Sequence, residues 1–556
     1  MFVSLAAGLG ASLWQRSLAL SAARQSDEVT AYLEELLSSA DPDQHGGSWP
    51  TVVQLLDKSR AELPARFADS PDTRLRVLRV LLGSYRRMNR LDVAVPLAQE
   101  LLVLAQQRRG EADPLTLEAR FELAHSHHLV GQCDRGLAVI EPALPLVRAL
   151  PVEQLDALTL PAVSLYGLCL RQQGRFDEAE RVLDEERRLI ERLPPGSKWI
   201  YGYYNHLSAL RQSQGRLRDA LEAVRRTEPL WQSTEPEDQR EILTQQRNLL
   251  QLQIRLAEHH RIEERLAELI GRIDALMGPG AQLGIQARND LARYRLEVGR
   301  YRAAAEQAEA TLAQVRQAGV QRAVVLLPVR ARALVARTQA GVRATAGLQV
   351  EARSLFVEAQ AQAAELGGQR PEVLLAVARS ALALDDAELA AQALDAMQAD
   401  ASLNLEPGPR QDLPLAARKW QLDGQLARLR GDLPASRRLL AARLEELGRS
   451  TERRQVTAWS VALDLAYTLV LAGAPEAADA LDGAASRRPE SIPAEHPLDL
   501  AARYLRERLV AGTDDAPAVL AARTALWQAQ RRDSPDAGNR PPPGAPFKGA
   551  MGGVLF

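Results

Sequence analysis

The stretch LYGLCLRQQGRFDEAERVL, residues 165–183, shows the design that recurs through most of this 556-residue chain. It places a small residue, Gly167, inside an apolar helix-forming segment, and then a glycine, Gly174, two residues before Phe176. Gly174 suits the left-handed backbone that ends a helix, and Gly167 lets a second helix come close. The stretch therefore predicts two antiparallel helices joined by a tight turn.

The same design recurs at a nearly constant interval. Clear copies begin at Leu81, Leu123, Leu207, Leu291, Leu422 and Leu465, and weaker copies fall around residues 256–269, 331–364 and 374–397. The small residues that close the clear motifs are Ala94, Gly136, Ala179, Ala220, Ala304, Ser436 and Ala478, and directly consecutive copies are 41 to 43 residues apart. Because one hairpin cannot bury its apolar faces alone, we predict an all-α, right-handed α-solenoid of stacked helix hairpins.

The composition agrees with helices and argues against several functions. Apolar residues make up 46% of the chain but aromatic residues only 4%, so Ala and Leu, the residues of helix packing, dominate. Lys and Arg number 69 against 71 Asp and Glu, which leaves no net positive field for nucleic acid. Two cysteines, Cys133 and Cys169, are too few for a disulfide framework or a four-cysteine zinc site.

The repeats resemble the tetratricopeptide repeat in its longer form of about 42 residues. The resemblance covers residues 75–488 and weakens after residue 320. It implies a concave groove lined by the first helix of each repeat, which would bind a protein or a peptide. Carried onto this chain, the groove positions are Arg79, Arg86, Arg87, His125, His128, Arg171, Gln172, Asn205, Gln212, Asn289 and Arg293. Five of them are arginines, so the expected ligand carries carboxylates; an ordinary solvated helix face is the alternative.

A second resemblance concerns residues 26–88. This segment is similar to the stretch between the membrane helix and the tetratricopeptide array of certain bacterial Hanks-type serine/threonine kinases. The matching positions are Leu36, Ala40 to Pro42, Val52, Leu55 to Asp57, Phe67 to Asp69 and Pro71. Since the chain contains no Gly-rich phosphate loop and no HRD or DFG motif, the resemblance implies the non-catalytic region of such a kinase. The array would then lie outside the cytoplasm; without this relation we expect a cytoplasmic protein.

The first residues carry the only membrane signal. Met1 to Trp14 is uncharged and apolar, but it is shorter than the roughly 20 residues that span a bilayer. Two interpretations stay open: part of a transmembrane helix, or an interfacial or buried helix. We divide the chain into this helix (1–25), a helical linker (26–74), well-formed repeats (75–320), weaker repeats (321–532) and a disordered Pro/Gly-rich tail (533–556).

Candidate chemistry is sparse. Glu122, His125, His127, His128 and Cys133 are close enough in sequence to suggest zinc, but they occupy the first helix of a clear repeat, so we interpret the histidines as groove residues. We predict no catalytic residue, no metal and no cofactor, because no GxSxG, HExxH or CxxC motif occurs. The predicted function is a peptide-binding scaffold in a kinase-type signalling system. The alternative is the sensor array of a transcriptional regulator that lacks its effector domain.

Overall fold

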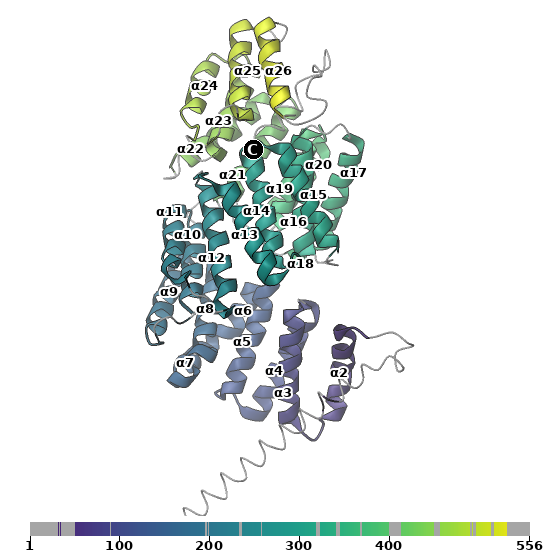
Figure 1. Cartoon of the computed structure of the whole chain (residues 1–556), viewed down its shortest axis with the longest axis vertical. Helices are drawn as coiled ribbons and strands as arrows, with labels where there is room; N and C mark the ends of the chain where they lie inside the picture. The colour runs from purple at the N-terminus through teal and green to yellow at the C-terminus, as the bar shows by residue number, and fades with distance from the viewer. Residues whose placement is uncertain are drawn as a thin grey trace, which may run out of the picture. The chain divides into compact units, whose positions relative to one another are not determined.

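A computed structural model describes most of the repeat region (Figure 1). The described residues are 32, 34, 50–88, 90–194, 197, 199–232, 236–256, 258–317, 323–340, 345–366, 370–399, 413–449, 456–489, 492, 496–512 and 516–530. The predicted N-terminal helix and the predicted tail from residue 533 lie outside them. In the part of the chain that is described, no helix is both long and apolar enough to cross a membrane.

The described residues form helices and no strand, as predicted, and their contacts divide the chain into two compact units, Met1–Leu189 and Ile190–Phe556. The helices of unit 1 are α2 (Val52–Arg66), α3 (Pro71–Arg87), α4 (Leu91–Arg109), α5 (Pro114–Leu129), α6 (Cys133–Ile140), α7 (Leu144–Arg148), α8 (Leu160–Gln172) and α9 (Phe176–Ile190), whose last residue passes the division. The division falls within residues 75–320, which the sequence treats as one array.

Unit 2 continues the pattern of paired helices. They are α10 (Trp199–Ser213), α11 (Leu217–Arg225), α12 (Pro236–Arg255), α13 (Ile262–Met277), α14 (Gln282–Glu297), α15 (Tyr301–Gln317), α16 (Ala323–Gln339), α17 (Thr345–Ala361), α18 (Ala363–Leu366), α19 (Arg370–Ala383), α20 (Ala387–Gln398), α21 (Leu413–Leu429), α22 (Leu433–Arg449), α23 (Val456–Leu471), α24 (Ala477–Ala485), α25 (Pro497–Ala511) and α26 (Pro517–Gln530). Each unit is thus an all-α solenoid of helix hairpins, which confirms the predicted fold class.

The predicted glycines make the hairpin turns. Positive φ angles, from 61° to 83°, occur at Gly131, Gly174, Gly215, Gly299, Gly431 and Gly473. The small residues inside the first helices also act as predicted. A Cβ atom at Gly167 would lie 3.1 Å from Val182, and one at Gly424 would lie 2.7 Å from Leu440. These two glycines therefore allow the first helix of a repeat to approach the second.

The three weak copies are real hairpins, α12/α13, α16/α17 and α19/α20. Two of them lack the glycine that marks the other turns, since Arg261 and Asp385 take the left-handed conformation there, with φ angles of 50° and 58°. Because these two turns contain no glycine, the sequence pattern is weak there although the left-handed turn still forms. The hairpin α25/α26 follows residue 488, where the recognisable repeats end.

Three local sequence patterns can be compared with the structure. Thr51 with Gln54, after Pro50, predicts a capping box, and this box forms at the start of α2. Ser70 followed by Pro71 predicts a helix cap; α3 begins there, but the Ser70 side chain makes no capping hydrogen bond. Ala478 is exposed, while its neighbour Ala477 is fully buried, because α24 begins at Ala477 rather than two residues after Gly473.

Candidate functional site

Five consecutive first helices of unit 2 each place one arginine around a single cavity. The arginines are Arg255 on α12, Arg293 on α14, Arg332 on α16, Arg379 on α19 and Arg418 on α21. The cavity encloses about 1270 Å³, its open mouth included. We call it the arginine pocket. Because hairpin repeats stack with their first helices side by side, residues one repeat apart converge here although they are far apart in sequence.

Two carboxylates share this pocket with the five arginines. Glu297 lies on α14 and Glu372 on α19. Arg418 Nη1 donates to both carboxylate oxygens of Glu372, at 3.0 and 3.2 Å. Five guanidinium groups against two carboxyl groups leave an excess of positive charge, which favours an anionic ligand.

Polar neighbours hold some of these arginines in place. Arg255 Nη1 donates to Gln212 Oε1 at 2.6 Å, and Arg332 Nε approaches Asn289 Oδ1 at 3.4 Å. Nε and Nη2 of Arg293 are buried, and neither has an acceptor among the described residues. A buried guanidinium with unused donors costs free energy unless a ligand supplies an acceptor. Arg293 can therefore donate two hydrogen bonds to an anion in the pocket.

Burial shifts the pKa values of charged side chains in the pocket. It lowers the pKa of Arg332 and of Arg379 to about 10, and neighbouring arginines add to this effect. It also raises the pKa of Glu297 to about 7, although the surrounding arginines oppose the rise. Arg418 lowers the pKa of Glu372. At neutral pH both buried arginines stay charged while Glu297 is only partly ionised, so the positive excess persists.

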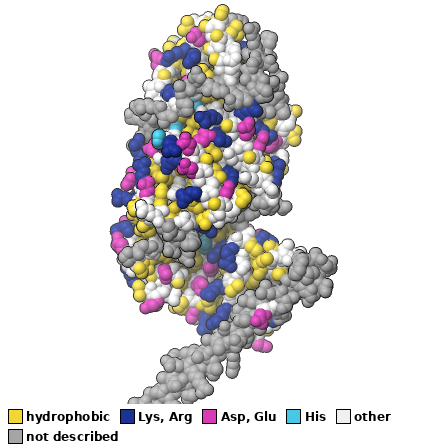
Figure 2. All heavy atoms as spheres, viewed as in Figure 1, with side chains coloured by type: hydrophobic (Ala, Val, Ile, Leu, Met, Phe, Trp, Pro, Cys, Tyr) yellow, Lys and Arg dark blue, Asp and Glu magenta, His cyan; other side chains and the backbone are white. Residues whose placement is uncertain are grey.

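The rest of the pocket wall is apolar. Leu296, Pro328, Val335, Val373 and Leu422 contribute to it, together with Ala331, Leu375, Ala376 and Leu217. A site with convergent charged groups on an apolar wall fits a ligand that has both carboxylates and hydrophobic groups. By contrast, on the face drawn in Figure 2 basic and acidic side chains are intermixed. Selectivity for an anion is thus better served by the arginine pocket, where five arginines converge, than by this outer face.

The predicted groove residues of unit 1 are largely engaged in contacts between repeats. Arg79 Nη1 donates to Glu118 at 2.8 Å, and Arg86 forms an ion pair with the largely buried Glu122. Arg86 Nη1 also lies 3.2 Å from His125 Nδ1, and burial lowers the pKa of His125 to about 4. Arg87 is exposed and, among the described residues, donates to Ser84 at 3.4 Å. These residues are on the predicted helices, α3 and α5, but they do not line the arginine pocket.

The remaining predicted residues fall into two places. His128, Arg171 and Gln172 lie beside the two cysteines of unit 1. In unit 2, Asn205 accepts from Asn248 at 2.9 Å, whereas Gln212, Asn289 and Arg293 touch or line the arginine pocket. Sequence analysis finds Arg293 and misses the other four arginines. A search for arginines on every first helix, weak repeats included, would have found them.

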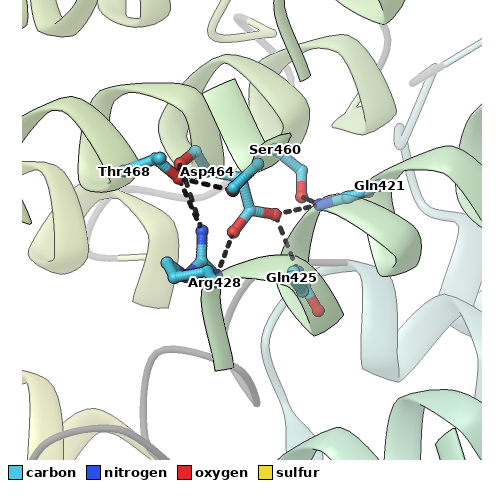
Figure 3. Close-up of polar contacts among 7 residues, drawn as sticks. Gln421, Gln425, Arg428, Ser460, Asp464 and Thr468 are labelled. Carbon is cyan, nitrogen blue, oxygen red and sulfur yellow. Dashed lines mark hydrogen bonds and ion pairs between the residues drawn. The ribbon is translucent and has the colours of Figure 1, made fainter. Parts of the chain in front are cut away.

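A second polar cluster of unit 2 is closed rather than open. Figure 3 shows the fully buried Asp464 of α23 between Gln421, Gln425 and Arg428 of α21. Its carboxylate accepts from Gln421 and Gln425 at 2.6 and 2.7 Å, and from Arg428 at 2.7 Å. Because its carboxylate is paired and hydrogen-bonded in the interior, we assign this cluster to the alignment of α21 with α23 and not to ligand binding.

One group of described residues has the chemistry of metal ligands: His128, Cys133 and Cys169. They belong to unit 1 and come from α5, α6 and α8. The hydrogen bond with Cys169 lowers the pKa of Cys133 to about 6, and His128 contributes to the effect. The thiol of Cys169 has a raised pKa, for which the same hydrogen bond is the main cause.

Comparisons with known proteins do not assign this chain to a family. No family model and no curated protein matches it. Among solved structures, it is similar to a Rap protein complexed with competence and sporulation factor, at 11% identity over 67% of this chain and 99% of that one, with a TM-score of 0.44.

It is also similar to a signal-transduction ATPase of Pyrococcus horikoshii with a tetratricopeptide repeat sensor, at 15% identity and a TM-score of 0.41. That match covers 66% of this chain and about half, 52%, of the ATPase. A third similar structure is the Cut9–Hcn1 hetero-tetramer, at 11% identity over 84% of this chain and 96% of that one, with a TM-score of 0.26. At these scores the likeness assigns neither a ligand nor an activity to this chain.

Proposed function

We propose that this protein is a non-catalytic scaffold whose arginine pocket binds a protein segment carrying at least two carboxylates beside hydrophobic side chains. The observation that carries the proposal is the convergence of five arginines, one from each of five consecutive first helices, on one cavity. Charge-assisted hydrogen bonds from guanidinium to carboxylate are strong and directional. The apolar wall of the pocket offers contacts for neighbouring side chains of the ligand.

The unused donors of Arg293 support a carboxylate in this place. Glu372 occupies Arg418, and Gln212 and Asn289 approach Arg255 and Arg332, but nothing accepts from Nε and Nη2 of Arg293 within the described residues. A planar guanidinium binds a carboxylate through two parallel hydrogen bonds. The first carboxylate of the ligand therefore belongs at Arg293 and the second nearer Arg332 and Arg379.

The test begins with peptides selected from an unphosphorylated random library displayed against the full chain. Their affinities are then measured for the wild type and for a triple variant, Arg293→Gln, Arg332→Gln and Arg379→Gln. We expect the selected peptides to be rich in Asp and Glu and to lose affinity by at least about a hundredfold in the variant. Binding should also weaken as salt concentration rises.

A matched triple variant, Arg218→Gln, Arg226→Gln and Arg438→Gln, removes the same charge from exposed positions and should bind like the wild type. Circular dichroism checks that both variants stay helical. Equal binding by the wild type and the pocket variant would refute the site. A second library should contain phosphorylated peptides as well. If only phosphorylated peptides are selected from it, the proposal that the ligand binds through carboxylates is wrong.

For the cellular role, we propose the signalling context that residues 26–88 imply, a membrane-linked bacterial kinase system with the array outside the cytoplasm. A transcriptional regulator without its effector domain is the alternative. The support for the first is the resemblance at Val52, Leu55 to Asp57 and Pro71. Translation of the DNA upstream of Met1 distinguishes them, because the kinase relation requires HRD and DFG motifs in the same reading frame.

A further inference from the structure

The two cysteines of the chain come together in unit 1 although they belong to different repeats. Cys133 is the first residue of α6, and Cys169 lies near the end of α8. Their Sγ atoms are 2.9 Å apart, and their side chains are 1% and 0% exposed. Sequence spacing does not reveal this pair, because only the stacking of α8 on α5 and α6 brings Cys169 to Cys133.

An imidazole completes the group. His128 Nδ1, from the last turn of α5, lies 3.3 Å from Cys133 Sγ and 3.9 Å from Cys169 Sγ. Gln172 Oε1 lies 2.7 Å from Cys133 Sγ and offers an oxygen to the same cluster. His127, the neighbour of His128, is engaged elsewhere, with its Nδ1 3.1 Å from Gln132 Oε1. Four donor atoms from three helices thus surround one small volume.

Local backbone features build this arrangement. Gly131 takes a φ of 76° between α5 and α6, so the chain reverses and returns Cys133 to the end of α5. Gly136 keeps room for the neighbouring repeat, since a Cβ atom there would lie 3.5 Å from Cys169 Sγ and 3.1 Å from the Ala124 carbonyl oxygen. The cluster therefore depends on the turn and the small residue that the clear repeats supply.

The three atoms are close enough to bind a single ion. Atoms separated by 2.9, 3.3 and 3.9 Å share a centre about 2 Å from each of them, which is close to the zinc–nitrogen bond length. Zinc–sulfur bonds of about 2.3 Å in a tetrahedral site require the two sulfurs to separate by a further ~0.8 Å when the ion binds. Two thiolates and one imidazole suit zinc, whereas calcium and magnesium prefer oxygen ligands. We propose that His128, Cys133 and Cys169 bind one zinc ion, with Gln172 Oε1 or a water molecule as the fourth ligand.

Binding releases the two thiol protons to solvent, and the resulting thiolates neutralise the charge of the ion. The ion would cross-link α5, α6 and α8, which belong to two consecutive repeats of unit 1. This assignment departs from the expectation that the chain has no metal site, because sequence spacing does not show that Cys169 lies beside Cys133 and His128. A simple disulfide is the competing outcome for two sulfurs at 2.9 Å, but it would leave the position of His128 without a role.

The experiment uses the full chain, reduced and freed of metal with a chelator, and titrates it with Co²⁺ as a spectroscopic substitute for zinc. We expect one Co²⁺ per chain, with the near-ultraviolet absorption of thiolate-to-cobalt charge transfer, and displacement of the cobalt by Zn²⁺. Cys133→Ser and Cys169→Ser should each abolish the charge-transfer band. His128→Asn should weaken binding by at least about tenfold.

His125→Asn is the matched control, because His125 lies on the same helix and contacts Arg86 instead of the sulfurs. It should bind cobalt like the wild type. A wild-type chain that binds no stoichiometric cobalt while both thiols are reduced would overturn the proposal, as would binding that survives both cysteine variants.

A second readout needs no variant. Because both thiols are buried, alkylation is followed in moderate urea, at which the metal-free chain reacts. Zinc should protect both cysteines of the wild type there, as counted by mass spectrometry. Unchanged alkylation of either thiol in the presence of zinc would also overturn the site, whether or not the substituted chains fold.

Discussion

At the scale of single residues, polar side chains on the first helices form ion pairs and hydrogen bonds with the first helix of the next repeat. Arg247 of α12 pairs with Asp290 of α14 at 2.7 Å, and Gln251 donates to the same carboxylate at 2.9 Å. Such pairs join neighbouring hairpins on the side where each first helix meets the next. Interaction energy between neighbouring repeats is what stabilises a solenoid, so these contacts contribute to stability rather than to a free binding surface.

The pair of Arg86 and Glu122 gives a first prediction. The Glu122 side chain is 13% exposed, and burial raises its pKa although Arg86 opposes the rise. Arg86→Ala would leave a buried carboxyl group without its cation, so the free energy of unfolding should fall by about 3 kcal/mol. Urea denaturation followed by circular dichroism measures this. Arg87→Ala, at an exposed neighbour, should change stability little, and equal effects of the two would contradict the assignment.

Glu297 predicts a pH dependence. Burial raises its pKa to about 7 from an ordinary value of 4.5, and it faces Arg293 on its own helix, Arg255 of α12, Arg332 of α16 and Arg418 of α21. The folded state therefore holds the proton more tightly than the unfolded state. The stability that this proton contributes is complete below pH 4.5 and is lost as pH rises through about 7.

Relative to Glu297→Gln, the melting temperature of the wild type should therefore fall between about pH 5 and pH 8. Comparing the two proteins cancels the titration of other groups. A constant difference across this range would show that Glu297 does not titrate there.

The sequence predicts which helix carries the groove residues better than it predicts what each residue does. Arg79 and Arg86 are on a first helix as expected, but their partners Glu118 and Glu122 lie one repeat further on. Side-chain direction within a first helix decides between a contact with the next repeat and a place in a cavity. That direction depends on how the repeats stack, which a single sequence does not specify.

At the scale of elements, the turns follow directly from the sequence. A glycine at the end of the first helix predicts the left-handed turn, and the structure confirms it at Gly174 and Gly431. Where Arg261 or Asp385 takes the same conformation, the hairpin forms without the signal, because neighbouring hairpins hold the turn in place. The reverse case is the α23/α24 turn, where the glycine is present but α24 begins later than predicted.

Two glycine substitutions should have opposite effects. Gly431 has a φ of 83°, and no atom would lie within 4 Å of a Cβ added there, so Gly431→Ala should cost about 1 kcal/mol of stability from backbone strain alone. Gly271 is exposed inside α13 with equal free space, so Gly271→Ala should stabilise by about 0.5 to 1 kcal/mol. Urea unfolding midpoints measure both. A gain at Gly431 would contradict the role of the turn.

At the scale of the whole molecule, unit 2 contains a contact that no repeat pattern predicts. His496 begins α25 and places its Nε2 2.9 Å from the carbonyl oxygen of Glu297, at the end of α14. Pro497 packs on Gly299, where a Cβ atom would lie 2.4 Å from the proline Cδ. The hairpin α25/α26 is therefore fixed to the centre of unit 2 beside a residue of the arginine pocket.

Gly299→Ala should loosen this contact. It introduces the same left-handed strain as Gly431→Ala and adds a clash with Pro497, so it should destabilise more. Hydrogen exchange should speed up in α25 and α26 for Gly299→Ala and stay unchanged there for Gly431→Ala. Equal exchange in both variants would show that the contact does not hold the last hairpin.

The arginine pocket also belongs to this scale. Its five arginines come from three weak repeats and two clear ones, so no single repeat displays the pattern. Stacking alone brings the positive charges together and leaves Arg293 with unused donors. The class of ligand, a carboxylate-bearing segment, can be expected from the arginine-rich first helices. The proposed location of the ligand in unit 2 rather than unit 1 rests on the arrangement of the helices in the structure.

The most direct test of this account is hydrogen exchange of the full chain with and without a selected acidic peptide. We predict that the peptide protects segments of α14, α16, α19 and α21, around Arg293, Arg332, Arg379 and Arg418. Protection of α3, α5 and α8 instead, with unchanged exchange in the pocket helices, would place the ligand at the residues first expected from the repeat pattern and would contradict the central claim.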